Sequence, residues 1–191
     1  MARAGLDTAS VVRAGAEFAD IHGLEALTLR GLAAELGVRA PSLYGHVDSL
    51  QDLRRRIGVV GSRGLTKAMT QATEGGELSG REALAALAYA YRAYAREHPG
   101  AYAAAQRARE LAQDREAVAA ANEAIVPVLA VLRDYGLDGD EAIHAARVLR
   151  AALHGYIVLE AEQGFAIDLP LDGTLDRLLG VLDRGLRTSP K

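Results

Sequence analysis

Residues 28–47 of the chain read TLRGLAAELGVRAPSLYGHV, and this stretch decides the fold. Apolar residues recur at helical spacing over about 29–36, with Thr28 before them as a suitable N-cap and Gly37 after them as a stop. Pro41 suits the first turn of a short third helix, because its missing N–H needs no partner there. This order of helix, glycine-centred turn and short helix is typical of a helix-turn-helix, whose second helix can lie in the major groove of DNA.

The composition is that of an ordinary globular protein with a strong helical tendency. Of the 191 residues, 50% are apolar and 25% are charged, and alanine, the best helix former, is very abundant. The chain has no cysteine, which excludes disulfides, thiolate catalysis and Cys-ligated zinc. No apolar run reaches the ~18 residues that span a bilayer, and the N-terminus lacks the residue order of a signal peptide. We therefore expect a cytoplasmic protein with no membrane partner.

The charge is not that of a generally basic nucleic-acid binder. The formal net charge of the chain is -3. Residues 1–56 contain seven arginines and seven acidic residues, and residues 57–191 contain 15 basic and 18 acidic residues. DNA binding by this chain would therefore depend on a local patch rather than on the field of the whole protein.

Helical spacing continues along almost the whole chain and predicts an all-α fold of about nine helices. The sequence Ser49-Leu50-Gln51-Asp52 is similar to a capping box and opens a long fourth helix that reaches the low 70s. We expect a helix-turn-helix DNA-binding domain over residues 1–56 and a helical effector-binding and dimerisation domain over residues 57–191. The other helices are expected over about 8–22, from Ser79 to His98, from about Ala101, over about 114–135 and 140–163, and across 175–186.

The short third helix has one apolar face and one polar face. Leu43 and Val47 are four residues apart and should face the core, which leaves an outward set of Ala40, Ser42, Tyr44, Gly45 and His46. Hydroxyls, an imidazole and backbone N–H groups can all donate hydrogen bonds to phosphates. Arg39 in the turn, Arg30 in the second helix and the run Arg54–Arg56 add positive charge. Spacing alone leaves two interpretations open, a DNA-binding surface and a purely structural helix pair with solvated arginines.

The run from Leu27 to Asp52, with LTLRGLAAELGVRAPSLYGHV followed by SLQDL, resembles the DNA-binding head of the TetR/AcrR family of bacterial repressors. The resemblance covers residues 8–56. It implies that the short third helix enters the major groove through Arg39, Ala40, Pro41, Ser42, Tyr44, Gly45 and His46. It also implies phosphate contacts for Thr28, Tyr44 and His46.

Two residues depart from the pattern of that family. Leu50 stands where the family usually has a phosphate-binding lysine, and Gly45 contributes no side chain between Tyr44 and His46. Both departures weaken the expected grip on phosphate. We hypothesise that Arg54–Arg56 compensate.

The C-terminal part resembles the body of TetR relatives named for a Trp-His-Gly motif. The resemblance is carried by EHPGAY at 97–102, ALHGYIVLEAEQGF at 152–165 and GTLDRLLGVLDRGL at 173–186, with Leu153 in place of the Trp. It implies a two-fold homodimer held by the last two helices, with plain intramolecular core as the alternative for their leucines. It also implies a cavity for a small-molecule effector, and the low charge of the middle helices favours an apolar or aromatic one. The candidate interface residues are Leu149, Leu153, Leu175, Leu178, Leu179 and Leu182, and the candidate cavity residues are Tyr91, Tyr94, Tyr102, Tyr135, His154 and Tyr156.

No catalytic or metal-binding motif is present in the sequence. There is no GxSxG, Walker, HExxH or strand-linked GxGxxG pattern, and His144 and His154 are too far apart for a metal pair within one helix. We therefore expect no enzyme activity, no catalytic residues, no metal and no cofactor. The predicted function is that of a repressor that binds a palindromic operator as a dimer, because two recognition helices ~34–36 Å apart read successive major grooves. A small molecule would release it from DNA. The alternatives are a regulator without an effector and a helical ligand-binding or enzymatic bundle whose head does not bind DNA.

Overall fold

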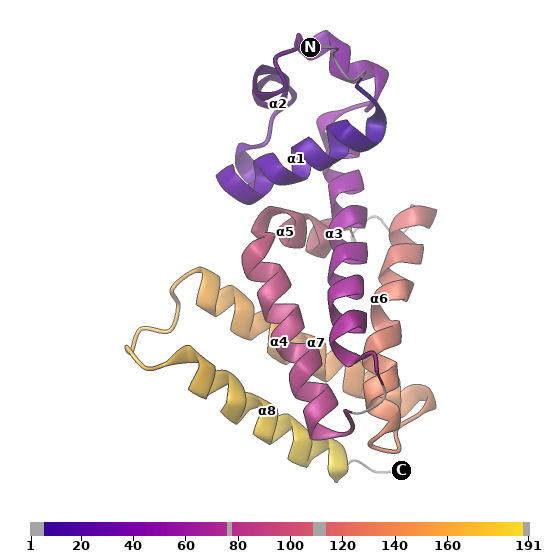
Figure 1. The fold of residues 1–191 in the computed structure, drawn as a ribbon, viewed down its shortest axis with the longest axis vertical. Coiled ribbons are helices and arrows are strands. Elements are labelled where there is room, and N and C mark those ends of the chain that lie inside the picture. Colours follow the sequence, from indigo (N-terminus) through magenta and orange to yellow (C-terminus); the bar gives the residue numbers. More distant parts are fainter. Residues whose placement is uncertain (1–5, 76–77, 109–113, 189–191) are drawn as a thin grey trace. The chain divides into compact units, whose positions relative to one another are not determined.

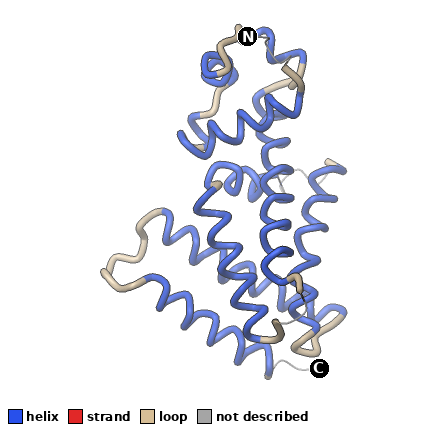
Figure 2. The backbone as a smooth tube through the Cα atoms, in the orientation of Figure 1, coloured by secondary structure: helices blue, strands red, loops and turns tan. Residues whose placement is uncertain are grey.

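The structure, a computed structural model, describes residues 6–75, 78–108 and 114–188, and all its regular elements are helical (Figure 1, Figure 2). The predicted all-α fold class is therefore confirmed. Eight α-helices and two 3-10 helices occur in the described ranges. Nine of these correspond to the nine expected helices, and the tenth is a single 3-10 turn that the sequence did not predict. The elements are α1 (Thr8–His22), η1 (Leu24–Ala26), α2 (Leu29–Glu35), η2 (Ala40–Gly45), α3 (Leu50–Thr73), α4 (Arg81–Glu97), α5 (Pro99–Ala108), α6 (Arg115–Arg133), α7 (Gly139–Ala161) and α8 (Leu171–Arg187).

The chain divides into two compact units. The first comprises Met1–Gly64 with Glu97–Ala121, and the second comprises Leu65–Arg96 with Asn122–Lys191. Helices α3 and α6 each contribute residues to both units. The division expected at residue 56 concerns function and stays a prediction, whereas the packing groups α5 with the helix-turn-helix.

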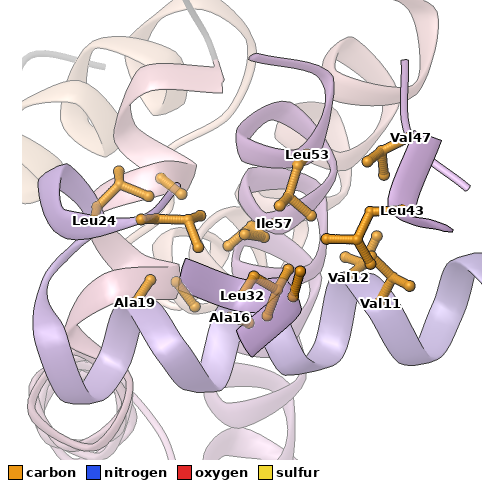
Figure 3. Close-up of a cluster of buried hydrophobic side chains, with 14 residues drawn as sticks. Val11, Val12, Ala16, Ala19, Leu24, Leu32, Leu43, Val47, Leu53 and Ile57 are labelled. Atoms are coloured by element: carbon orange, nitrogen blue, oxygen red, sulfur yellow. The ribbon is translucent and has the colours of Figure 1, made fainter. Parts of the chain in front are cut away.

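The first unit has one apolar core, to which α1, η1, α2, η2, α3 and α5 all contribute (Figure 3). Leu27, Leu32, Leu43, Leu53 and Ile57 are fully buried there. Each such side chain stabilises the fold by about 1.5–3 kcal/mol relative to an exposed one. The helix-turn-helix is therefore held by apolar side chains of α3 and α5 as well as by its own.

Helix α5 lies against α1 with unusually close backbone contact. A Cβ atom added to Gly100 would lie 2.1 Å from the carbonyl carbon of Ala19, so only glycine fits this position. The carboxylate of Asp20 accepts a hydrogen bond from the N–H of Ala101 at 2.9 Å and lies 3.1 Å from Nδ1 of His98. Asp20 therefore satisfies a backbone donor in the first turn of α5 and fastens that helix to α1.

The second unit contains α4, α7 and α8 together with parts of α3 and α6. Its interior includes Leu84, Leu87, Leu149, Leu175 and Leu179, each no more than 2% exposed. The apolar positions of α7 and α8 recur at helical spacing and face this interior.

A buried arginine ties three elements of the second unit together. The guanidinium of Arg92 on α4 donates two hydrogen bonds to the carboxylate of Glu160 on α7, at 2.8 and 2.5 Å, and one to Asp172 on α8 at 2.6 Å. It also lies over the ring of Tyr156, 5.7 Å from the centroid. The hydroxyl of Tyr156 donates to the carbonyl oxygen of Leu171 at 2.9 Å, so the start of α8 is held by two neighbouring contacts.

Candidate nucleic-acid interface

The turn between α2 and η2 is closed by a regular C-terminal capping motif. The N–H of Val38 donates to the carbonyl oxygen of Ala33 at 2.9 Å, and the N–H of Gly37 donates to that of Ala34 at 3.2 Å. These two bonds form a Schellman motif, which places Gly37 in the left-handed region with φ of +65°. At the other end of α2, Oγ1 of Thr28 accepts a hydrogen bond from the N–H of Gly31 at 3.0 Å, which confirms Thr28 as the predicted N-cap. The turn and the helix before it are therefore fixed in conformation.

The third helix of the head is a 3-10 helix and not an α-helix. Its carbonyl bonds are one residue shorter in span, as in Ser42 N–H to Arg39 O at 2.9 Å and His46 N–H to Leu43 O at 2.9 Å. Leu43 and Val47 face the core and are at most 2% exposed, as predicted. Of the expected outward set, Ser42 and Tyr44 are exposed together with Gly45 and Pro41.

Ala40 and His46 are only partly exposed, which corrects the expectation that both face outward. Ala40 packs against the apolar core of the first unit. The backbone of His46 is anchored as well, since its carbonyl oxygen accepts a hydrogen bond from the hydroxyl of Thr8 at 3.4 Å. The exposed polar surface of η2 is thus smaller than the sequence predicted.

Arg30 and Arg39 are exposed, and neither makes a hydrogen bond or ion pair in the part of the chain that the structure describes. Arg54 differs from both. Its guanidinium donates to the carbonyl oxygens of Leu24 at 3.1 Å and Leu27 at 3.5 Å, which fastens η1 to α3. These contacts indicate a structural role for Arg54, and its expected contact with DNA stays a prediction.

Arg55 and Arg56 are also engaged within the protein. Arg55 forms ion pairs with Asp52 at 2.7 Å and with Asp114 at 2.6 Å, and Arg56 contacts Asp52 at 2.9 Å. Burial raises the pKa of Asp52, but the hydrogen bonds from Arg55 and Arg56 outweigh it and leave the pKa below its usual value. The hypothesis that Arg54–Arg56 replace the missing lysine would require these arginines to leave partners that they already have.

The start of α3 offers no cation to a phosphate. Leu50 is partly buried and packs against the core of the first unit, which accounts for an apolar residue at this position. Oγ of Ser49 accepts a hydrogen bond from the N–H of Asp52 at 3.0 Å, as the predicted capping box requires. The reciprocal bond differs, because the carboxylate of Asp52 accepts from the N–H of Asp48 at 3.2 Å instead of that of Ser49.

The candidate cavity residues belong to both units. Tyr102 lies in the first unit, and the other five lie in the second. Tyr91, Tyr102 and Tyr156 are buried, whereas Tyr94, Tyr135 and His154 are partly buried. The hydroxyl of Tyr135 donates to the carboxylate of Asp183 at 2.8 Å. Burial, followed by this hydrogen bond, raises the pKa of Tyr135 above its usual value, so it stays protonated at neutral pH.

Five of the six leucines expected at a dimer interface are already buried within the single chain. Leu149, Leu153, Leu175 and Leu179 are at most 2% exposed, and Leu182 is 9% exposed. A side chain this deeply buried has almost no apolar area left to bury against a second chain. These five leucines therefore form the intramolecular core of α7 and α8, and only the partly buried Leu178 retains surface for an interface.

Other kinds of site find no support in the described ranges. Among residues 6–75, 78–108 and 114–188, no three His, Asp or Glu side chains come together as metal ligands. No helix in those ranges combines the length and apolarity needed to cross a membrane.

The comparisons with known proteins agree with the fold and with the head. Residues 84–182 match the family model described as tetracyclin repressor-like, C-terminal domain. The chain is 39% identical over 184 residues to Rv0681 of Mycobacterium tuberculosis, an uncharacterized HTH-type transcriptional regulator, covering 96% of this chain and 83% of that protein. It is 37% identical over 165 residues to YobS of Bacillus subtilis, which has the same description, covering 85% of this chain and 83% of that protein.

A solved structure of BioQ with its double-stranded DNA operator shares the fold. Its TM-score is 0.69 at 22% sequence identity, with 97% of this chain and 100% of that chain covered. The family model and the two regulators at more than one-third identity extend from the helix-turn-helix to α8. On these grounds the chain belongs to the TetR family and is a transcriptional regulator, not an enzyme.

Proposed function

We propose that this regulator is a ligand-responsive repressor that binds a palindromic operator as a homodimer through the exposed surface of η2. The observation that carries the proposal is the state of this surface. Its backbone is fixed by the capping motif at Gly37 and by the buried Leu43, while Ser42 and Tyr44 remain exposed. A surface held rigidly by its backbone and left unpaired by the protein is suited to base and phosphate contacts.

Dimerisation is supported by the exposed faces of α7 and α8. On α7, Val148 is 57% exposed and Leu159 is 45% exposed, and both lie on one face with Gly155. On α8, Val181 is 57% exposed and lies near the partly buried Leu178 along the helix. Exposed apolar residues on two packed helices are typical of a homodimer interface. We propose this face in place of the buried leucines.

Release by a small molecule follows from linkage. A ligand that binds more tightly to the arrangement of heads that does not fit the operator lowers the affinity for DNA, and DNA lowers its affinity by the same factor. Helix α3 has residues in both units, so it is the element that we propose to connect ligand binding to the head. Because the operator is chromosomal, the expected location of this regulator is the cytoplasm.

The proposal is tested by binding of the purified protein to DNA upstream of its own gene, by fluorescence anisotropy at two salt concentrations and with a panel of apolar and aromatic compounds. We expect a dimer that prefers one palindrome and is released by at least one compound. Tyr44→Phe should weaken operator binding several-fold, because a hydrogen bond to a charged phosphate contributes about 1.5–3 kcal/mol. Tyr89→Phe is the matched control, since the hydroxyl of Tyr89 donates to Asp176 in the second unit. Equal affinity for all sequences would exclude operator recognition, and unchanged binding with every compound would favour a regulator without an effector.

A further inference from the structure

The arginines of the helix-turn-helix segment differ in what they already bind. Residues 1–56 contain seven arginines and no lysine. In the described part of this segment, Arg54, Arg55 and Arg56 donate to carbonyl or carboxylate oxygens of the protein. Arg13, Arg30 and Arg39 are exposed and make no such bond among the described residues. The cations available to DNA are therefore fewer than the sequence suggests.

Only one of these available arginines adjoins the exposed surface of η2. Arg39 is the N-cap residue of η2, with an extended backbone of φ −85° and ψ 142°. Its carbonyl oxygen accepts the hydrogen bond from Ser42 that starts the 3-10 helix, and the preceding Val38 packs against the core. The backbone of Arg39 is thus fixed on both sides, while its side chain is exposed.

The neighbours of Arg39 on this surface have little capacity to distinguish base pairs. Ala40, Pro41 and Gly45 have no polar side-chain atom, and Ser42 and Tyr44 each offer one hydroxyl. An arginine guanidinium donates two parallel hydrogen bonds, which match O6 and N7 of guanine in the major groove. A hydroxyl, by contrast, pairs with any base.

The glycine at position 45 does not result from a backbone constraint. A Cβ atom added there would meet no atom within 4 Å, and the backbone is not in the left-handed region. The surface therefore has room for a further base-contacting side chain at position 45 but does not carry one. This concentrates the discrimination between base pairs on the residue beside η2 that can make two hydrogen bonds.

We infer that Arg39 is the residue that determines sequence specificity, through a bidentate contact to one guanine in each half-site of the operator. The inference rests on the proposed function, and it adds the identity of a base pair and of the residue that reads it. Arg30 lies in the first turn of α2, one turn from the cap formed by Thr28. A cation there disfavours the helix dipole, and a phosphate bound beside it would remove that penalty, so Arg30 suits a backbone contact.

The test is selection of binding sites from random DNA by the full-length protein and by three variants, Arg39→Ala, Arg39→Lys and Arg13→Ala. The wild type should select a palindrome with one invariant G·C pair in each half-site. Arg39→Ala and Arg39→Lys should both lose preference at that pair, by about 5- to 150-fold relative to the other bases, although the lysine keeps the charge. Arg13→Ala removes an exposed charge from α1 and should leave the selected sequence unchanged.

The outcomes separate this inference from the proposed function. If the wild type selects no palindrome, the proposed function fails. If it selects a palindrome whose guanine preference persists in Arg39→Ala, or in which only Arg39→Ala and not Arg39→Lys loses the preference, the bidentate contact is overturned and operator binding stands. Because the side chain of Arg39 is exposed, the circular-dichroism spectra and unfolding midpoints of its variants should equal those of the wild type.

Discussion

Replacing Arg92 by methionine should strongly destabilise the second unit. The guanidinium is 8% exposed and Glu160 is 12% exposed, whereas Asp172 is 75% exposed. Removing Arg92 leaves the carboxylate of Glu160 buried with no cation beside it, while Asp172 can be solvated. Loss of one partner from a buried ion pair costs about 3–5 kcal/mol, and most of this cost should arise from Glu160.

The double variant Arg92→Met with Glu160→Met tests this assignment. A buried ion pair that is replaced by apolar residues of similar volume often loses little stability, because two desolvation costs disappear with one attraction. The double variant should therefore recover most of what Arg92→Met loses. Arg96→Met, one turn further along α4 at an exposed position, is the matched control and should change stability by less than about 0.5 kcal/mol.

The measurement is urea unfolding followed by circular dichroism at a fixed protein concentration, with the slope of each transition compared between variants. The expected order of midpoints is wild type and Arg96→Met together, then the double variant, then Arg92→Met. A loss below about 1 kcal/mol for Arg92→Met would show that the ion pairs contribute little. A double variant less stable than Arg92→Met would show that Glu160 stabilises the unit by other contacts.

Three further perturbations address the head, its acid stability and the dimer. Gly100→Ala places a Cβ atom 2.1 Å from the backbone of Ala19 and should cost at least about 1–3 kcal/mol in thermal or urea unfolding, whereas Gly185→Ala, with open space at its Cβ, should be neutral or stabilising. The lowered pKa of Asp52 means that its ion pairs stabilise the fold above the usual carboxyl pKa and lose this effect as the pH falls through the lowered value. Asp52→Asn should accordingly lower the urea midpoint at pH 6 more than at pH 3, and an equal loss at both would contradict the assignment. Val148→Glu should convert the dimer to monomer in size-exclusion chromatography with light scattering, while Val126→Glu, at an equally exposed site on α6, should leave it dimeric; dissociation by both would refute the proposed face.

The local elements of the head were predictable because each depends on a few adjacent residues. Thr28 as a cap, Gly37 as a stop and Leu43 and Val47 as core positions all follow from spacing and from side-chain chemistry. The capping box of Asp7 and Ser10, in which each side chain bonds the backbone of the other, was missed although its two residues stand three apart as such a box requires. That η2 is a 3-10 helix was also missed, since residue spacing over six positions does not separate the two kinds of helix.

Contacts between distant residues were beyond prediction for a different reason. The partners of Arg92 are 68 and 80 positions away in the sequence, and no local pattern marks them. The leucines of α7 and α8 show the same limit, because the helical period identifies an apolar face but not the surface that covers it. For these leucines the covering surface lies within the same chain.

The head and the rest of the first unit share one core, and this affects how a DNA-binding domain can be defined here. A boundary at residue 56 falls inside α3, just before the fully buried Ile57. It also separates Asp20 from His98 and Ala101, and Ala19 from Gly100. A segment of three short helices has little apolar surface to bury, so the loss of these partners removes a large part of what holds η2 in place. The residues that contact DNA may be counted within 1–56, but the conformation of η2 depends on α3 and α5 as well. Any change that moves α5 against α1 must therefore disturb the packing beneath the DNA-contacting surface.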